Sequence, residues 1–96
     1  MDEKLLLPAR IDSAAVRAVA EGIQARRGQP LTLDAAQVEF AGALGLQVLI
    51  AAHRQWREAG LAFRVTGAGE ALLDICRTLG VAPAEIGAGP EEGAPA

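Results

Sequence analysis

Residues 31–50 read LTLDAAQVEFAGALGLQVLI, and this stretch decides the fold. The segment from Pro30 to Asp34 is too short for a helix and alternates apolar with polar side chains, which predicts an interior strand. Its terminal acid would then stand at the carboxyl end of the sheet. Residues 35–41 are predicted to form a connection, in which we expect Val38 and Phe40 to point into the core.

The second half of this stretch opens a long apolar helix that runs from Gly42 to Gly60. Its apolar and aromatic side chains keep helical spacing, and Arg54 and Arg57 fall in the final turns, where the helix dipole favours positive charge. Because this segment is the most apolar in the chain, we expect it to be the most buried helix. The spaced residues are Leu46, Leu49, Ile50, His53 and Trp56.

A strand and a helix precede this unit. Residues 4–11 read as a strand in which Pro8 either marks a sheet edge or ends the pairing. Asp12 or Ser13 then offers an N-cap, and Gly28 stands where a C-cap is expected. The helix between them has one apolar face, made of Val16, Val19, Ala20 and Ile23.

Another strand and helix follow the central unit, at residues 61–66 and 70–79. The third helix has its apolar side chains at helical spacing and ends at Gly80. A β-α-β-α-β-α order implies right-handed crossovers, so we predict an α/β domain with a mainly parallel sheet of three to five strands and three or four helices. Residues 81–86 could add a short strand. The spaced residues of the third helix are Leu72, Ile75, Cys76 and Leu79.

Length and composition bound the function. A chain of 96 residues suits one domain, which we assign to residues 1–86, with a disordered Gly/Pro/Ala/Glu tail at 87–96. Three of the twelve acids lie in the last dozen residues, which leaves nine acids against nine basic residues over 1–84. That neutral body argues against nucleic-acid binding. A single cysteine, an acidic start and no long apolar run predict a cytoplasmic protein without membrane insertion.

Two segments carry a resemblance to a known family. Residues 33–50 run from Leu-Asp through Val38 and Phe40 to Gly42-Ala43-Leu44-Gly45-Leu46, and residues 7–12 read Leu-Pro-Ala-Arg-Ile-Asp. This pattern resembles the STAS (anti-sigma-factor-antagonist) family, in which a strand ends in Leu-Asp and Asp-Ser-(Ser/Thr)-Gly-Leu-Gly leads into an apolar helix. The resemblance extends from about Leu5 to Val81.

The chain departs from the family pattern at its regulatory position. In the family, a partner kinase phosphorylates the Ser or Thr just before the glycine; here that position is Leu44, preceded by Ala43 and Gly42. Leucine cannot accept a phosphate, so this chain is predicted to lack the usual switch. Two interpretations stay open: Leu44 belongs to a permanent apolar contact surface, or it packs into the core. Gly42 and Gly45 let the backbone approach either a partner or a neighbouring strand.

The resemblance implies a non-catalytic module that binds an anti-sigma factor, or a histidine kinase or response regulator of the chemotaxis type. The alternative is an accessory subunit of a phospholipid-transport ABC transporter, with the ABC ATPase as partner; a homodimer and a small-ligand sensor also remain open. The expected contacts lie in the loop and at the start of the second helix. They are Asp34, Val38, Glu39, Ala41, Gly42, Ala43, Leu44, Gly45 and Gln47.

No side-chain pattern predicts an active site. Asp34 with Glu39 could form a carboxylate pair, but an acid at a strand end more often binds loop amides. No Ser, Cys or Asp stands at a spacing that would complete a triad with His53. Cys76 falls in an apolar helical pattern and is expected to be buried. We therefore predict no enzymatic activity, no cofactor and no metal.

Overall fold

A computed structural model of the chain describes residues 3–88. Three parallel strands form the main sheet in the order β1-β3-β5: β1 is Glu3–Leu6, β3 is Leu31–Asp34 and β5 is Phe63–Thr66. Leu5 pairs with Leu33, and Leu33 pairs with Val65. The parallel sheet and the interior position of residues 31–34 confirm the prediction.

A second, two-stranded parallel sheet joins β2 (Arg10–Ile11) to β4 (Phe40–Ala41). The segment predicted as one strand over 4–11 is therefore two strands that belong to different sheets. Pro8 lies at the break, where the amide of Gln37 donates a hydrogen bond of 3.0 Å to the carbonyl of Leu7. The break matters because it turns β2 toward β4 and the start of the next helix.

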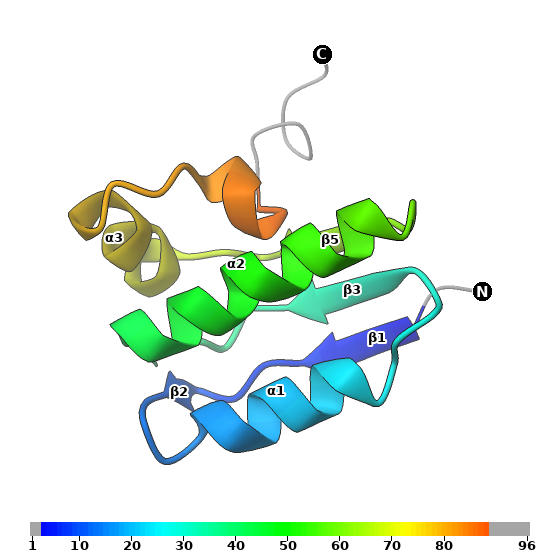
Figure 1. Ribbon diagram of the computed structural model, residues 1–96. Coiled ribbons are helices and arrows are strands. Elements are labelled where there is room, and N and C mark those ends of the chain that lie inside the picture. The colour runs from blue at the N-terminus through cyan, green and yellow to red at the C-terminus, as the bar shows by residue number, and fades with distance from the viewer. Residues whose placement is uncertain (1–2, 89–96) are drawn as a thin grey trace.

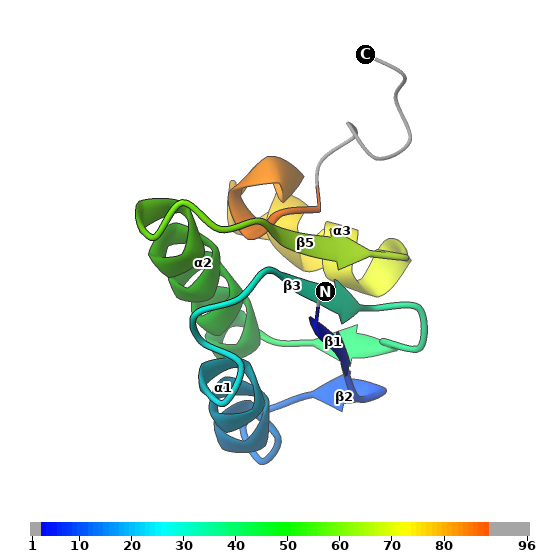
Figure 2. The ribbon, with the colours of Figure 1, turned by 90° about the vertical axis from the view of Figure 1, so that its right-hand side faces the viewer.

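Three α-helices and one 3-10 helix complete the fold: α1 is Val16–Gln24, α2 is Ala43–Glu58, α3 is Glu70–Thr78 and η1 is Pro83–Ile86. Helices α1 and α2 lie side by side on one face of the main sheet, and α3 lies beyond the carboxyl end of β5 (Figures 1 and 2). The other face of the sheet exposes Lys4, Leu6 and Arg64. The core therefore lies between the sheet and the α1–α2 layer.

Alternation in the strands and helical spacing in α2 fill this core. Leu31, Leu33 and Val65 point from the sheet toward the helices and are almost completely buried. Trp56 of α2 is 2% exposed, lies 5.5 Å from the Phe63 ring, and donates its indole N–H to the carbonyl of Gln29 at 2.7 Å. As predicted, α2 is the most buried of the three α-helices, with five buried residues against two in α1 and two in α3.

Two apolar residues predicted for the core lie at the surface. Phe40 is 41% exposed, because successive side chains of a strand point to opposite sides and Ala41 takes the inward position. The guanidinium of Arg10, its partner across the two-stranded sheet, lies over the ring at 4.7 Å. Leu79 is 43% exposed, because α3 ends at Thr78, so Leu79 no longer continues the buried face of the helix.

Helix and domain boundaries also differ from the predictions. The carboxylate of Asp12 accepts the N–H groups of Ala14 and Ala15, both at 3.1 Å, and thus caps a turn that precedes α1. Residues 83–86 form η1 and not a strand; Pro83 stands at its start. The predicted tail begins too early, since Gly87 and Ala88 are buried against the domain. The rest of that tail, 89–96, lies outside the described residues.

Candidate functional site

The start of α2 stands at the surface beside the two-stranded sheet. Gly42 is the N-cap, in an extended conformation, and its N–H donates to the carbonyl of Ile11 at 3.1 Å. Leu44, the second residue of the helix, is 60% exposed. The interpretation in which Leu44 packs into the core is therefore wrong, because most of its side chain faces solvent.

A shallow cavity of about 320 Å³ lies beside Leu44. Strand β2, the turn before α1, strand β4 and the first turn of α2 all contribute to it. Its walls are mostly apolar and backbone atoms, with one exposed hydroxyl from Ser13. The residues that line it are Ile11, Asp12, Ser13, Phe40, Gly42, Ala43, Leu44 and Gly45.

Gly45 explains how α2 comes so close to β2. A Cβ atom at this position would lie 2.5 Å from Cγ2 and 3.3 Å from the carbonyl oxygen of Ile11. Ile11 is 1% exposed and belongs to the core. Gly45 therefore allows close approach to the neighbouring strand β2 and not to a partner. Gly42 has no such role, because a Cβ on it would meet no atom closer than 3.7 Å.

The other predicted contact residues separate into two groups. Glu39, Ala43 and Gln47 are exposed near Leu44, and Gln47 stands on the same side of α2 because it follows Leu44 by three residues. Val38 and Ala41 are buried in the core and can only support the surface from below. We call the exposed group the Leu44 surface, defined as Glu39, Phe40, Ala43, Leu44 and Gln47.

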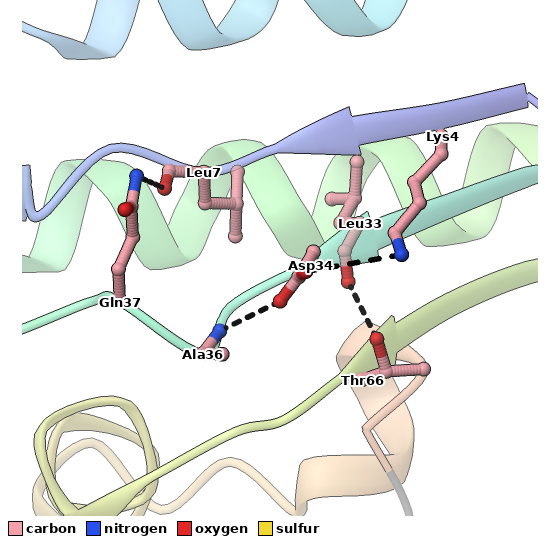
Figure 3. A network of polar contacts seen from close by, with 7 residues as sticks. All are labelled: Lys4, Leu7, Leu33, Asp34, Ala36, Gln37 and Thr66. Carbon is pink, nitrogen blue, oxygen red and sulfur yellow. Dashed lines mark hydrogen bonds and ion pairs between the residues drawn. The ribbon is translucent and has the colours of Figure 1, made fainter.

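Asp34 lies apart from the Leu44 surface and has a local structural role. Its carboxylate accepts the N–H of Ala36 at 2.9 Å and lies 3.9 Å from the ammonium group of Lys4 (Figure 3). Beside it, the hydroxyl of Thr66 donates to the carbonyl of Leu33 at 3.4 Å. This arrangement stabilises the turn after β3, as expected for an acid that binds loop amides.

The sequence analysis missed two residues of the site, Phe40 and Arg10. Phe40 was assigned to the core, but within β4 Ala41 takes the inward position and the ring of Phe40 is exposed. Arg10 stacks on that ring and lies 3.5 Å from the carboxylate of Asp12, so its side chain is held from both sides. No local signal could have found Phe40, because β4 has only two residues and the burial of residues 38–41 does not alternate.

Other reactive side chains are dispersed. In the part of the chain that the structure describes, no three His, Cys, Asp or Glu residues lie close enough to hold a metal ion. Cys76 is buried, and burial, assisted by the negative charge of Glu85, raises the pKa of its thiol. No helix among residues 3–88 is long and apolar enough to cross a membrane.

The chain belongs to the STAS domain family: residues 2–83 match the family model described as "Mlab, STAS domain". The match confirms the resemblance found in the sequence. No curated protein sequence matches the chain. STAS domains are in general non-catalytic modules of regulation and signalling that interact with proteins.

Proposed function

We propose that this chain binds a partner protein permanently through the Leu44 surface, without a phosphorylation switch. The single observation that carries the proposal is the 60% exposure of Leu44 in the first turn of α2. More than half of this leucine is left uncovered by the domain, and a partner that buried it would contribute up to about 1.5–3 kcal/mol.

The neighbours of Leu44 support a protein contact. The exposed ring of Phe40 lies on the same cavity, and aromatic residues are enriched where proteins bind one another. Arg10 and Asp12 form a polar rim beside the apolar centre. An apolar centre with a polar rim is the usual anatomy of a protein interface.

The leading candidate for the partner is a signalling protein: an anti-sigma factor, a histidine kinase or a response regulator. The STAS resemblance supports such partners, and with any of them the module would act in the cytoplasm. Because Leu44 cannot be phosphorylated, regulation of the complex would have to come from the partner.

The second candidate is an accessory subunit of a phospholipid-transport ABC transporter, in which the Leu44 surface would contact the ATPase. One observation favours it: a surface with leucine in place of a hydroxyl suits a subunit that stays bound. Signalling by release, by contrast, needs a group whose charge can change.

The experiment is a pull-down with mass spectrometry that compares wild type, Leu44→Glu and the matched control Leu79→Glu. Both variants place a carboxylate at an exposed leucine, but Leu79 is the C-cap of α3 and does not line the cavity beside Leu44. We expect Leu44→Glu to lose the partner and Leu79→Glu to retain it. The identity of the protein that is lost, signalling protein or ABC ATPase, decides between the two candidates.

The stability of Leu44→Glu makes the experiment interpretable. A carboxylate in the first turn of a helix is favourable by about 0.3–1 kcal/mol, so this variant should unfold at the same urea concentration as wild type or higher. If the folded variant captures the same proteins as wild type, the proposal is wrong. If analytical ultracentrifugation shows a wild-type dimer that Leu44→Glu dissociates, a second copy covers the surface instead.

A further inference from the structure

A second hollow, of about 280 Å³, opens at the other end of α2. Arg57, which lines it, follows Leu44 by 13 residues, which corresponds to about 20 Å along the helix axis. The final turns of α2, the start of β5 and η1 enclose the hollow, and η1 lies against α2 near β5 (Figure 1). This site is therefore separate from the Leu44 surface and from the proposed function.

Close packing builds the wall of this cavity. Gly87, at the end of η1, has a φ of 83°, and a Cβ on it would lie 2.6 Å from the carbonyl oxygen of Phe63. Its own carbonyl accepts the N–H of Val65 at 3.0 Å, and the N–H of Ala88 donates to Pro83 at 2.9 Å. The end of η1 is thus held firmly on the edge of β5.

The charge of the cavity is one-sided. Among its lining residues, His53, Arg57 and Arg64 carry basic side chains and none carries an acid. The ion pairs within residues 3–88 engage Lys4, Arg10, Arg26 and Arg77, and no carboxylate of these residues lies within 4.0 Å of either arginine of the cavity. Arg57 also suits the negative end of the α2 dipole, but that reason does not apply to Arg64 on β5.

Flat apolar groups accompany the charge. The ring of His53 lies 5.9 Å from the ring of Phe63, at an interplanar angle of 54°, and both residues line the cavity. Leu61 adds an aliphatic side chain. The cavity therefore offers cationic groups for an anion and an apolar wall for an organic substituent.

We propose that this cavity binds the phosphate monoester of a small organic molecule. The guanidinium group of Arg57 would hold the phosphate, since arginine presents paired N–H donors that match phosphate oxygens. Arg64, whose side chain leaves β5 on the opposite face of the sheet, would add positive charge at the edge of the cavity. The organic part would lie against His53 and Leu61. Neither lipid nor protein is required for this site, because the cavity is the size of a small ligand.

The test is an NMR titration of the full chain with phenyl phosphate and, separately, with inorganic phosphate, at constant ionic strength. We expect saturable shifts of the Phe63, Arg64 and Gly87 amides, and tighter binding of phenyl phosphate than of inorganic phosphate. Arg57→Gln should lower the affinity for phenyl phosphate by about tenfold, which is the effect of losing one charge-assisted contact. Arg54→Gln removes the same charge from the same helix outside the cavity and should bind like wild type.

Several results would overturn the proposal. Equal weakening by Arg57→Gln and Arg54→Gln would show only general attraction to a basic helix end. Equal affinity for the two probes would mean an adventitious ion only. Changes of amide chemical shift confined to residues 40–47 would show that the ligand binds at the other end of α2. If circular dichroism shows that Arg57→Gln is unfolded, Arg57→Lys replaces it and should also weaken the binding of phenyl phosphate, because lysine lacks the paired N–H donors.

Discussion

Gly45 of α2 packs so closely on Ile11 of β2 that a methyl group on its Cα would come within 2.5 Å of the isoleucine side chain. This contact sets the distance between the helix and the two-stranded sheet. It therefore fixes where Leu44, the preceding residue, emerges at the surface. The glycine belongs to the packing of the domain and presents no group to a partner.

The first prediction concerns this contact. Gly45→Ala should lower the free energy of unfolding by about 1–3 kcal/mol, because the buried Ile11 cannot move aside. The matched control is Gly22→Ala in α1, where a Cβ would meet Leu5 at an ordinary 3.4 Å. That variant should gain up to about 1 kcal/mol from helix propensity. Urea denaturation followed by Trp56 fluorescence measures both, and a Gly45→Ala protein as stable as wild type would refute the close approach.

The second prediction tests the positions of the two phenylalanines. Phe63 is 6% exposed, and Phe63→Ala should cost about 3–5 kcal/mol, as for other buried aromatic residues. Phe40→Ala should cost less than about 1 kcal/mol, since it removes mainly an exposed contact with Arg10. Chemical denaturation of the two variants under the same conditions decides the matter. An equal loss of unfolding free energy in the two variants would show that Phe40 is buried in the core.

The third prediction concerns the only tryptophan. Trp56→Phe should lower the free energy of unfolding by about 1–3 kcal/mol, because the carbonyl of Gln29 loses its indole donor in a partly buried place. Circular dichroism in urea measures this change, since the variant lacks the fluorescent probe. The wild-type emission should be blue-shifted and move to longer wavelength on unfolding. Red emission from the folded protein would contradict the burial of Trp56.

The fourth prediction concerns Cys76. Burial, and to a smaller extent the negative charge of Glu85, raises the pKa of the Cys76 thiol in the folded state. The thiol should therefore not react with a disulfide reagent at pH 8 until urea unfolds the protein. As the pH rises, the Cys76 thiol stays protonated to a higher pH in the folded state than in the unfolded chain. The contribution of the neutral thiol to the free energy of unfolding is fully present below the ordinary thiol pKa of about 8.5, and it falls as the pH rises above that value.

The control for this prediction is Cys76→Ala. It should flatten the decline of the unfolding free energy between pH 7 and about 9.5, although it lowers the overall stability by leaving a small cavity. The comparison is clean because the chain has no tyrosine and a single lysine, Lys4, which leaves few other groups that titrate there. Rapid labelling of the folded thiol would show that Cys76 is accessible.

Local patterns predicted most of the elements. The two-residue alternation of Leu31–Asp34 and the helical spacing of Leu46, Leu49 and Trp56 were sufficient for the central strand and the buried helix. These predictions succeeded because the repeat of a strand or a helix determines which of its side chains share the face that packs on the core. The STAS resemblance came from the same stretch, and the family match over residues 2–83 confirms it.

The candidate site was less predictable. The resemblance led us to expect that Leu44 occupies the regulatory position, but both a core and a surface location suited a leucine there. Phe40 was placed on the wrong side, because a two-residue strand is too short to display a period. Asp34 was included although it stabilises a turn on the other side of the sheet.

The sequence by itself determined the family, the order of strands and helices, and the absence of a hydroxyl at residue 44, because these follow from residue types and local spacing. Only the tertiary structure decided that Leu44 and Phe40 are exposed together, that Gly45 serves packing on Ile11, and that Arg57 and Arg64 border one cavity. Each of these depends on segments far apart in the chain. Their proximity arises from the packing of α2 on the sheets, which no local pattern encodes.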